Sequence, residues 1–164
     1  MISIDKTAKI SALCDIEDSV KGSKIIIGAN SVIDSFVKIK PAGGLGDLII
    51  GEKVIINSGC VIYTGNGIIM GNNISVASNC TFAPTNHQFI DKNKLINQQG
   101  FCQSKGGIII EDDVWIGANC VILDGAIIRR LLPTAKPSPK AKFCRAKFAL
   151  SHKPLAKRKN LTIF

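Results

Sequence analysis

The sequence predicts an all-β chain that folds as a triangular solenoid of short parallel strands, with one long protruding loop. Three observations carry this prediction. Bulky aliphatic residues recur every six positions, the hexads come in groups of three, and aromatic residues make up only 5% of the 164 residues. A core with so few aromatic side chains must be filled by branched and small aliphatic ones, which favours strands over helices.

The six-residue phase runs from Ile4 to Ile128. Its five triplets are Ile4, Ile10 and Ile16; Ile27, Ile33 and Ile39; Ile50, Ile56 and Ile62; Met70, Val76 and Phe82; and Ile110, Ile116 and Ile122, with Ile128 starting a sixth. Four positions after most of these lies a second small or β-branched residue: Ala8, Cys14, Val20, Ser31, Val37, Val54, Cys60, Ile74, Cys80, Val114, Cys120 and Ala126. Neither helical periodicity nor simple alternation gives this phase, whereas three short strands per coil do, with both residue types pointing inward.

Extra residues enter between triplets, after Ile16, Ile39, Ile62 and Phe82, so we expect them at one corner of the prism. Each coil would pair only with the next. Five coils at ~4.8 Å each give a solenoid roughly 24 Å long. We therefore expect one β-helix domain over residues 1–128.

The largest interruption runs from residue 84 to residue 109 and contains His87. A long excursion from a rigid solenoid often carries a binding or catalytic site. An imidazole there could act as a general base and take the proton from a sugar hydroxyl as its oxygen attacks a thioester. The alternative is an ordinary surface histidine in a polar loop. The position at a solenoid exit, the length of the loop and a tryptophan one coil later favour the catalytic interpretation.

The hexads, with Ile27-Gly28-Ala29-Asn30-Ser31-Val32-Ile33 as a clear example, resemble those of the left-handed parallel β-helix acyltransferases, the hexapeptide-repeat family. Left-handedness follows from this resemblance alone, because right-handed crossovers are the general rule. Pro84-Thr85-Asn86-His87-Gln88-Phe89 and the later Val114-Trp115-Ile116-Gly117 are similar to the maltose, galactoside and xenobiotic O-acetyltransferase branch and its polysaccharide-modifying relatives. The resemblance implies that acetyl-CoA is the donor, that a carbohydrate is the acceptor and that a homotrimer places each site between neighbouring prisms.

On the same resemblance, His87 is the base and Asn86 and Asn57 bind the acceptor. The Asn57 amide could also hold the developing oxyanion, or it could be a plain outward polar position. Trp115 would line the acyl or pantetheine channel, with Gly117 and Ala118 letting the donor arm approach the backbone. Packing of Trp115 against the loop around Phe101 is the alternative for this outward-facing indole. Where the branch often has a carboxylate after the asparagine, this chain has Tyr63-Thr64-Gly65.

The net charge of +9 is unevenly distributed. Residues 1–128 contain 10 Lys or Arg and 12 Asp or Glu, whereas residues 129–164 contain the other 11 basic residues and no acidic one. This basic tail has no repeat and begins where the family continues with a further donor-binding coil. Two accounts remain: a genuine basic cap that meets phosphates or another polyanion, or the product of a shifted reading frame, which the abrupt break in composition favours. The second account predicts weak donor binding.

The composition argues against several classes of protein. No apolar run reaches the length of a membrane span, and no signal peptide is recognisable, so we expect a cytoplasmic protein. With two histidines and no C-x-x-C pair, we expect no metal site; because four of the six cysteines occupy inward hexad positions, we expect no obligatory disulfide. We expect no nucleic-acid binding. The competing functions are an N-acetyltransferase acting on an amino sugar and a non-catalytic trimeric scaffold whose tail binds polyanions.

Overall fold

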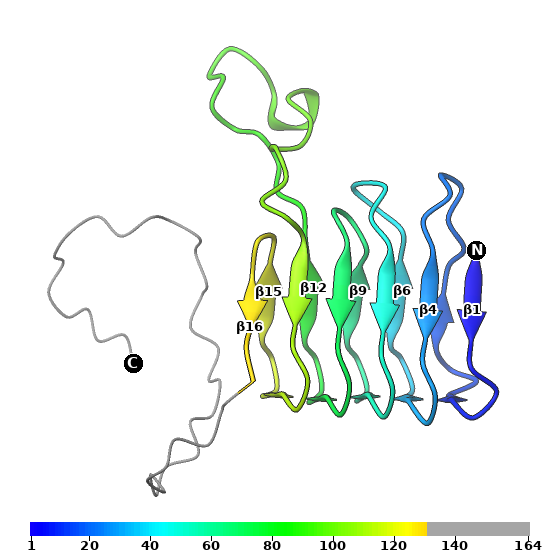
Figure 1. Cartoon of the computed structure of the whole chain (residues 1–164). Coiled ribbons are helices and arrows are strands. Elements are labelled where there is room, and N and C mark those ends of the chain that lie inside the picture. The colour runs from blue at the N-terminus through cyan, green and yellow to red at the C-terminus, as the bar shows by residue number, and fades with distance from the viewer. Residues whose placement is uncertain (131–164) are drawn as a thin grey trace, which may run out of the picture.

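The structure, a computed structural model, describes residues 1–130 and shows a left-handed parallel β-helix of three sheets (Figure 1). The first sheet contains β1 (Ile2–Ile4), β4 (Ile25–Ile27), β7 (Leu48–Ile50), β10 (Ile68–Met70), β13 (Ile108–Ile110) and β16 (Ile127–Ile128). The second contains β2 (Lys9–Ile10), β5 (Val32–Ile33), β8 (Ile55–Ile56), β11 (Ser75–Val76) and β14 (Trp115–Ile116). The third contains β3 (Asp15–Ile16), β6 (Lys38–Lys40), β9 (Val61–Tyr63), β12 (Thr81–Ala83) and β15 (Val121–Leu123).

The hexad phase predicted from the sequence sets the register of every sheet. In the first sheet Ile27 pairs with Ile50, Ile50 with Met70, and Met70 with Ile110. The inward rows of the three sheets form one core, in which Phe82 is the only aromatic side chain among the described residues. β16 shows that Ile128 does begin a sixth coil. The prediction of an all-β solenoid with three strands per coil is therefore confirmed.

The small residues four positions after each hexad start also point inward, with one exception. Cys60, Cys80 and Cys120 are buried, and Cys14 is half-buried in the first coil. The thiols of Cys14, Cys60 and Cys80 donate to the carbonyls of Val37, Ala77 and Gly117, each on the next coil. Burial raises the pKa of the Cys14 thiol.

Val20 is the exception, because its side chain is 98% exposed and the prediction that it points inward is wrong. It lies in the segment between β3 and β4, where the chain adds residues to the turn. An insertion there shifts the hexad frame, so a residue four positions after Ile16 no longer faces the core.

All the insertions fall at one corner of the prism, between the third sheet and the first, as the sequence predicts. We call this the insertion corner; it contains the segments between β3 and β4, β6 and β7, β9 and β10, and β12 and β13. The longest of them, residues 84–107, projects from the prism as a separate arm (Figure 1). The arm contains the 3-10 turn η1 (Ile96–Gln98). Ile108 and Ile109, included in the expected loop, belong to β13.

The basic tail and its two possible origins lie almost wholly outside the described residues, of which Arg129 and Arg130 are the last. Arg130 pairs with Asp113 at 3.4 Å, and Arg129 approaches Glu111 at 3.9 Å. Within residues 1–130 no helix is long and apolar enough to cross a membrane.

Candidate functional site at the base of the arm

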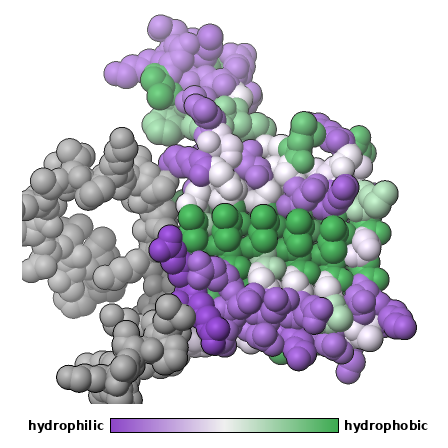
Figure 2. Space-filling view, viewed as in Figure 1, coloured by the Kyte–Doolittle hydropathy of each residue, from purple (hydrophilic) through white to green (hydrophobic). Residues whose placement is uncertain are grey.

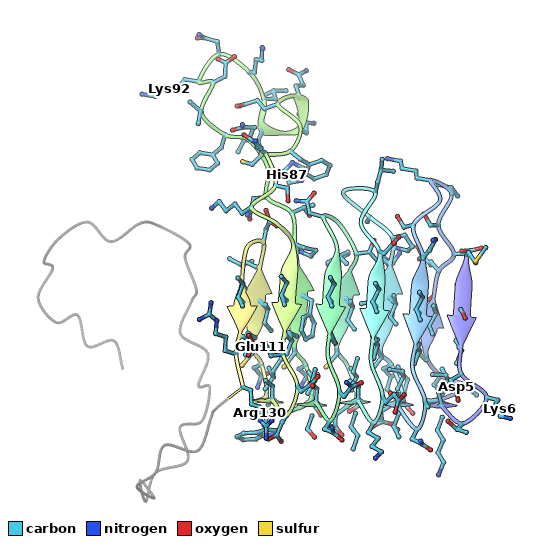
Figure 3. All side chains as sticks on the ribbon, viewed as in Figure 1. Asp5, Lys6, His87, Lys92, Glu111 and Arg130 are labelled. Carbon is cyan, nitrogen blue, oxygen red and sulfur yellow. The ribbon has the colours of Figure 1, made fainter. Side chains whose placement is uncertain are left out.

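His87 lies where the chain leaves the prism, four residues after β12 ends at Ala83 (Figure 3). Its side chain is exposed and its ring packs on Phe101, with ring centroids 4.6 Å apart and planes tilted by 45°. The two residues also form an antiparallel bridge between the outgoing and returning strands of the arm. The imidazole is thus supported on one side and open to solvent on the other, as a base acting on an incoming substrate requires.

The backbone around His87 is held by a short two-stranded stem. The Gln88 N–H donates to the Gly100 carbonyl at 2.9 Å, and the Cys102 N–H donates to the Asn86 carbonyl at 2.7 Å. The Cys102 thiol donates to the carbonyl of His87 itself at 3.2 Å. Since these bonds flank His87 on both sides, they fix where its side chain leaves the backbone.

Close packing on the turns of earlier coils holds the outgoing strand. Thr85 lies over two glycines of the insertion corner: a Cβ added to Gly43 or to Gly65 would come within 2.8 Å of the Thr85 side chain. Both glycines have positive φ, at +83° and +43°. No larger residue fits there without moving Thr85, which lies two residues before His87.

The returning strand is held by Asp124, a carboxylate that is only 3% exposed. Its Oδ2 accepts from the Lys105 N–H at 2.7 Å and its Oδ1 from the Gly107 N–H at 2.9 Å. Asp124 lies in the short turn between β15 and β16, which also joins the third sheet to the first and so stacks on the insertion corner. Sequence reasoning did not identify it, because Asp124 lies 17 and 19 residues from its partners and follows no hexad rule.

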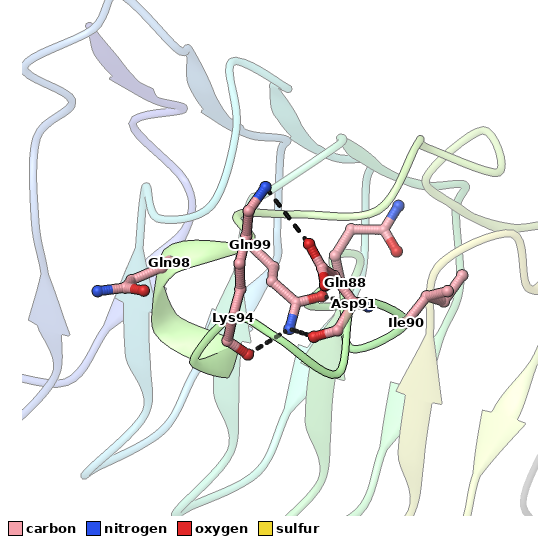
Figure 4. Close-up of a pocket in the computed structure, with 6 residues that line it drawn as sticks. All are labelled: Gln88, Ile90, Asp91, Lys94, Gln98 and Gln99. Carbon is pink, nitrogen blue, oxygen red and sulfur yellow. Dashed lines mark hydrogen bonds and ion pairs between the residues drawn. The ribbon is translucent and has the colours of Figure 1, made fainter.

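The far end of the arm folds around Gln99 (Figure 4). The Gln99 Nε2 donates to the carbonyls of Asp91 at 2.9 Å and Lys94 at 3.0 Å, while its Oε1 accepts from the Asp91 N–H at 3.0 Å. Lys94 also pairs with Asp91 at 3.4 Å. Half of the residues that line the hollow of about 320 Å³ at this end are these three, whose polar atoms bond to one another, and the others are Gln88, Ile90 and Gln98. We assign it a structural role.

Asn57 lies at a different corner from His87. It follows β8 and precedes β9, at the turn between the second and third sheets, and its Nδ2 donates to the Val76 carbonyl at 2.7 Å. The amide group thus supports the stacking of one coil on the next. Its Oδ1 is the atom that could accept a bond from a ligand hydroxyl.

Trp115, Gly117 and Ala118 are near the corner of Asn57. Trp115 begins β14 in the second sheet, pairs with Ser75 and is 48% exposed, which agrees with the outward position expected from the hexads. Gly117 and Ala118 follow in the turn between the second and third sheets, two coils beyond Asn57. The ring of Phe101 packs on His87, at the insertion corner, and not on this tryptophan.

Within one chain, the expected site residues therefore form two groups on opposite edges of the third sheet. His87 and Asn86 lie at the insertion corner, whereas Asn57, Trp115, Gly117 and Ala118 lie on the second sheet and the turn after it. The described residues contain no cluster of three His, Cys, Asp or Glu side chains that could hold a metal ion. The first group can exchange a proton, and the second offers a flat aromatic surface beside small residues.

No protein-family profile matches the chain, and no curated protein matches it. Among solved structures, it is similar to AntD, an N-acyltransferase from Bacillus cereus, in several complexes. A mutant bound to dTDP-4-amino-4,6-dideoxyglucose and coenzyme A is 25% identical, with a TM-score of 0.63, over 77% of this chain and 66% of that one. A mutant bound to dTDP and coenzyme A is 23% identical, with a TM-score of 0.62, over the same shares. The AntD complex with dTDP and 3-hydroxybutyryl-CoA is 24% identical, with a TM-score of 0.54, over 77% and 62%. The chain thus spans slightly less than two thirds of the AntD structures, and the match supports the left-handed β-helix fold.

Proposed function

We propose that the protein is an acyltransferase that moves an acyl group, acetyl in the first instance, from a coenzyme A thioester to a sugar hydroxyl, with His87 as general base. The observation that carries this proposal is the geometry of His87, an exposed imidazole supported by Phe101 at the rigid exit of a β-helix. The AntD structures support the donor class, because coenzyme A or an acyl-CoA is bound in them. A surface polysaccharide or lipopolysaccharide precursor is the proposed source of the hydroxyl.

The chemistry needs one proton transfer and one acyl transfer. A ring nitrogen of His87 takes the proton of the acceptor hydroxyl as that oxygen attacks the thioester carbonyl. The tetrahedral intermediate collapses when the carbon–sulfur bond breaks, and the coenzyme leaves as a thiol after receiving a proton, which the imidazolium of His87 can return. The step uses no metal ion, and neutral imidazole is the form that accepts the first proton.

The other expected residues would bind rather than react. Asn86, next to the base, would hold the acceptor, and the Oδ1 of Asn57 would accept from a second hydroxyl. Trp115 would pack against the pantetheine arm or the acyl group, and Gly117 and Ala118 would leave room beside it. One N–H of the Asn57 Nδ2 donates to the Val76 carbonyl, so its other N–H and its Oδ1 are the groups that would meet a substrate.

We further propose that the site is shared between copies in a homotrimer. The two groups of site residues lie at two different corners of the prism. Within one chain they therefore do not form a single site. A cyclic assembly that brings the insertion corner of one copy to the second sheet of the next would complete three equivalent sites. A cytoplasmic location fits the use of acyl-CoA.

Transfer to an amine is the second candidate function. The AntD structures are those of an N-acyltransferase, one of them with an amino sugar nucleotide bound. A base at the position of His87 could take a proton from an ammonium group as readily as from a hydroxyl. Two acceptors that differ only in carrying a hydroxyl or an amino group at one carbon separate the two candidates, since only the preferred acceptor should yield an acetylated product at an appreciable rate. A polyanion-binding scaffold would acetylate neither.

The experiment that tests the proposal compares His87→Ala with His152→Ala, which removes the only other histidine of the chain. We expect His87→Ala to lower thiol release from acetyl-CoA about 10²- to 10⁴-fold, the usual contribution of a general base. The molecular mass of the assembly should not change, because His87 is exposed. His152→Ala should keep full turnover. Unchanged turnover in His87→Ala would remove this residue from the role of base.

A further inference from the structure

The turn between the second and third sheets has the same left-handed residue in four successive coils. The third residue of this turn has a positive φ each time, +62° at Phe36, +72° at Gly59, +61° at Asn79 and +57° at Asn119. Glycine and asparagine adopt this conformation readily, whereas a bulky side chain in it is an outlier. Phe36 is therefore the member of this row whose type does not suit its backbone.

Phe36 is exposed as well as strained. It is 68% exposed, and no aromatic ring of residues 1–130 packs on it. Apolar exposure alone is common in this protein: Ile69 and Ile109 belong to a hydrophobic band on the outer face of the first sheet, but they pair as ordinary strand residues (Figure 2). Phe36 combines strained backbone with a phenyl ring in water. Residues held in such conformations cluster at sites that bind ligands.

Two polar side chains lie beside Phe36 at the same corner. Asp34 and Asn57 are the first residues of this turn in adjacent coils, about 4.8 Å apart along the prism, because Ile33 pairs with Ile56. Asp34 is exposed, and its Oδ1 accepts from the Ser35 N–H at 2.7 Å, which leaves its Oδ2 toward solvent. Asn57 offers its Oδ1 and one N–H of its Nδ2.

The turn surface next to Phe36 is low and polar. Gly59 occupies the position of Phe36 in the next coil and has no side chain to cover the ring. A Cβ at Gly59 would clash with the Oδ1 of Asn79, so the Asn79 amide lies across the glycine. The Phe36 ring thus stands beside a floor of backbone and amide groups.

We propose that Phe36, Asp34 and Asn57 form a carbohydrate-binding site, in which a pyranose ring of the acceptor stacks on Phe36 and its hydroxyls bind to Asp34 and Asn57. The C–H groups on one face of a pyranose suit the negative face of an aromatic ring. The hydroxyls around its rim donate to a carboxylate or an amide oxygen and accept from an amide N–H. The inference deepens the proposed function and rests on it for the class of ligand.

The place of this site along the prism fits a transfer between two substrates. Phe36 lies one coil before Asn57, whereas Trp115 and Gly117 lie two coils beyond it, so about 14 Å separates Phe36 from Trp115 along the axis. The acceptor would therefore approach Asn57 from the N-terminal coils and the donor from the C-terminal ones. Leu13, which is 60% exposed and accepts the Phe36 N–H at 3.1 Å, extends the apolar surface on the acceptor side.

The first test measures sugar binding in the absence of turnover. Full-length His87→Ala with ¹³C-labelled phenylalanine is titrated with the methyl glycosides of glucose, galactose, mannose and N-acetylglucosamine, and the Phe36 ring signal is assigned as the one lost in Phe36→Asn. We expect at least one glycoside to shift this signal in a saturable way. No shift with any of the four would overturn the proposal. A shift caused by coenzyme A instead would also overturn it, by assigning the ring to the donor.

The second test separates ligand binding from a structural role of the ring. Phe36→Asn installs the residue type found at Asn79 and Asn119, so its thermal midpoint should equal or exceed that of the wild type, with the mass of the assembly unchanged. Saturation transfer to the glycoside should show its dissociation constant raised about tenfold, and Phe36→Tyr should keep the affinity of the wild type.

Two further variants complete this test. Asp34→Asn keeps an acceptor for the Ser35 N–H but removes the charge, and it should raise the dissociation constant about tenfold. Val20→Asn, at a position that is 98% exposed and away from this corner, is the matched control and should bind as the wild type does.

Each outcome assigns the ring to one role. Unchanged affinity in Phe36→Asn would overturn the proposal, as would a lower thermal midpoint or an altered mass, because the ring would then pack against protein. In the transfer assay Phe36→Asn should raise the KM for the sugar and keep both kcat and the KM for acetyl-CoA. Sugar binding without any thiol release by the wild type would refute the acyltransferase function alone, whereas turnover without a shift of the Phe36 signal would refute this site alone.

Discussion

Asp124 offers the sharpest single perturbation of the site, because one buried carboxylate ties down the returning strand of the arm. Replacing it with alanine removes both acceptors, at 2.7 Å from the Lys105 N–H and 2.9 Å from the Gly107 N–H. The backbone N–H groups stay behind without their partner, one of them on a residue that is itself buried. An isosteric Asp124→Asn variant keeps one acceptor oxygen but turns an amide donor toward the other N–H.

The magnitude follows from the type of hydrogen bond. A hydrogen bond to a charged group contributes about 1.5–3 kcal/mol, and two bonds that share one carboxylate are not fully additive, so we expect Asp124→Ala to lose about 3 kcal/mol. Asp124→Asn should lose about 2 kcal/mol. The loss falls first on the arm, because the stem can open while the coils beneath it remain stacked.

Two measurements check this prediction. Amide exchange at Lys105 and Gly107 should become about a hundredfold faster in Asp124→Ala, the factor that corresponds to about 3 kcal/mol. Tryptic cleavage after Lys92 and Lys94, which lie at the far end of the arm, should also accelerate. Acyl transfer should fall with them, since His87 lies on the strand that pairs with the returning one.

The control is Asp112→Ala. Asp112 also accepts a backbone N–H, from Asn72 at 2.7 Å, but it is exposed and lies at a corner away from the arm. We expect it to cost about 1 kcal/mol and to leave exchange in the arm unchanged. If Asp124→Ala behaved like Asp112→Ala in both exchange and cleavage, the anchoring role assigned to Asp124 would be wrong.

Three further predictions concern the prism. Ile62→Ala, in the buried core, should lower the free energy of unfolding in urea by about 2–5 kcal/mol, whereas Ile55→Ala, at a position that is 41% exposed, should lower it by less than about 1 kcal/mol. Similar losses in the two variants would contradict the assigned hexad phase. Gly51→Ala would place its Cβ 2.4 Å from the Gly71 carbonyl oxygen. Gly100→Ala meets no atom within 4 Å and should cost only about 1–2 kcal/mol for its positive φ. The thermal midpoint of Gly51→Ala should therefore be the lower of the two, and the reverse order would contradict the close stacking of the coils. The buried thiols of Cys60, Cys80 and Cys120 should react with a thiol reagent only on unfolding, while Cys102 in the stem should react earlier. Rapid modification of Cys60 in the native protein would show that the turn between the second and third sheets opens.

The β-helix could be predicted almost residue by residue, because each coil repeats the same local requirement. An inward aliphatic residue such as Ile33 or Ile56 must recur every six positions for adjacent coils to stack, and this requirement is visible in the sequence alone. The prediction went wrong at Val20, where an insertion breaks the frame. Insertions relax the hexad rule, so their residues follow the geometry of each turn instead.

The site was only partly predictable. The exit of the chain after β12 made His87 a candidate, and the expectation that Trp115 faces outward is confirmed by its exposure. That His87 and Asn57 lie at two different corners follows from which turn each residue occupies, and the hexad count alone determines those turns. Asp124 could not be predicted, since its contacts depend on where the arm returns to the prism.

The most direct test of the central claim follows the acyl group itself. Full-length protein is incubated with acetyl-CoA carrying an isotopically labelled acetyl group and with a sugar acceptor, and the acceptor is then analysed by mass spectrometry. The account predicts a labelled acetyl sugar from the wild type and from His152→Ala, in amounts equal to the free coenzyme released, and essentially none from His87→Ala. Equal labelling of the acceptor by wild type and His87→Ala, or intact thioester with every hydroxyl and amino acceptor tried, would contradict it.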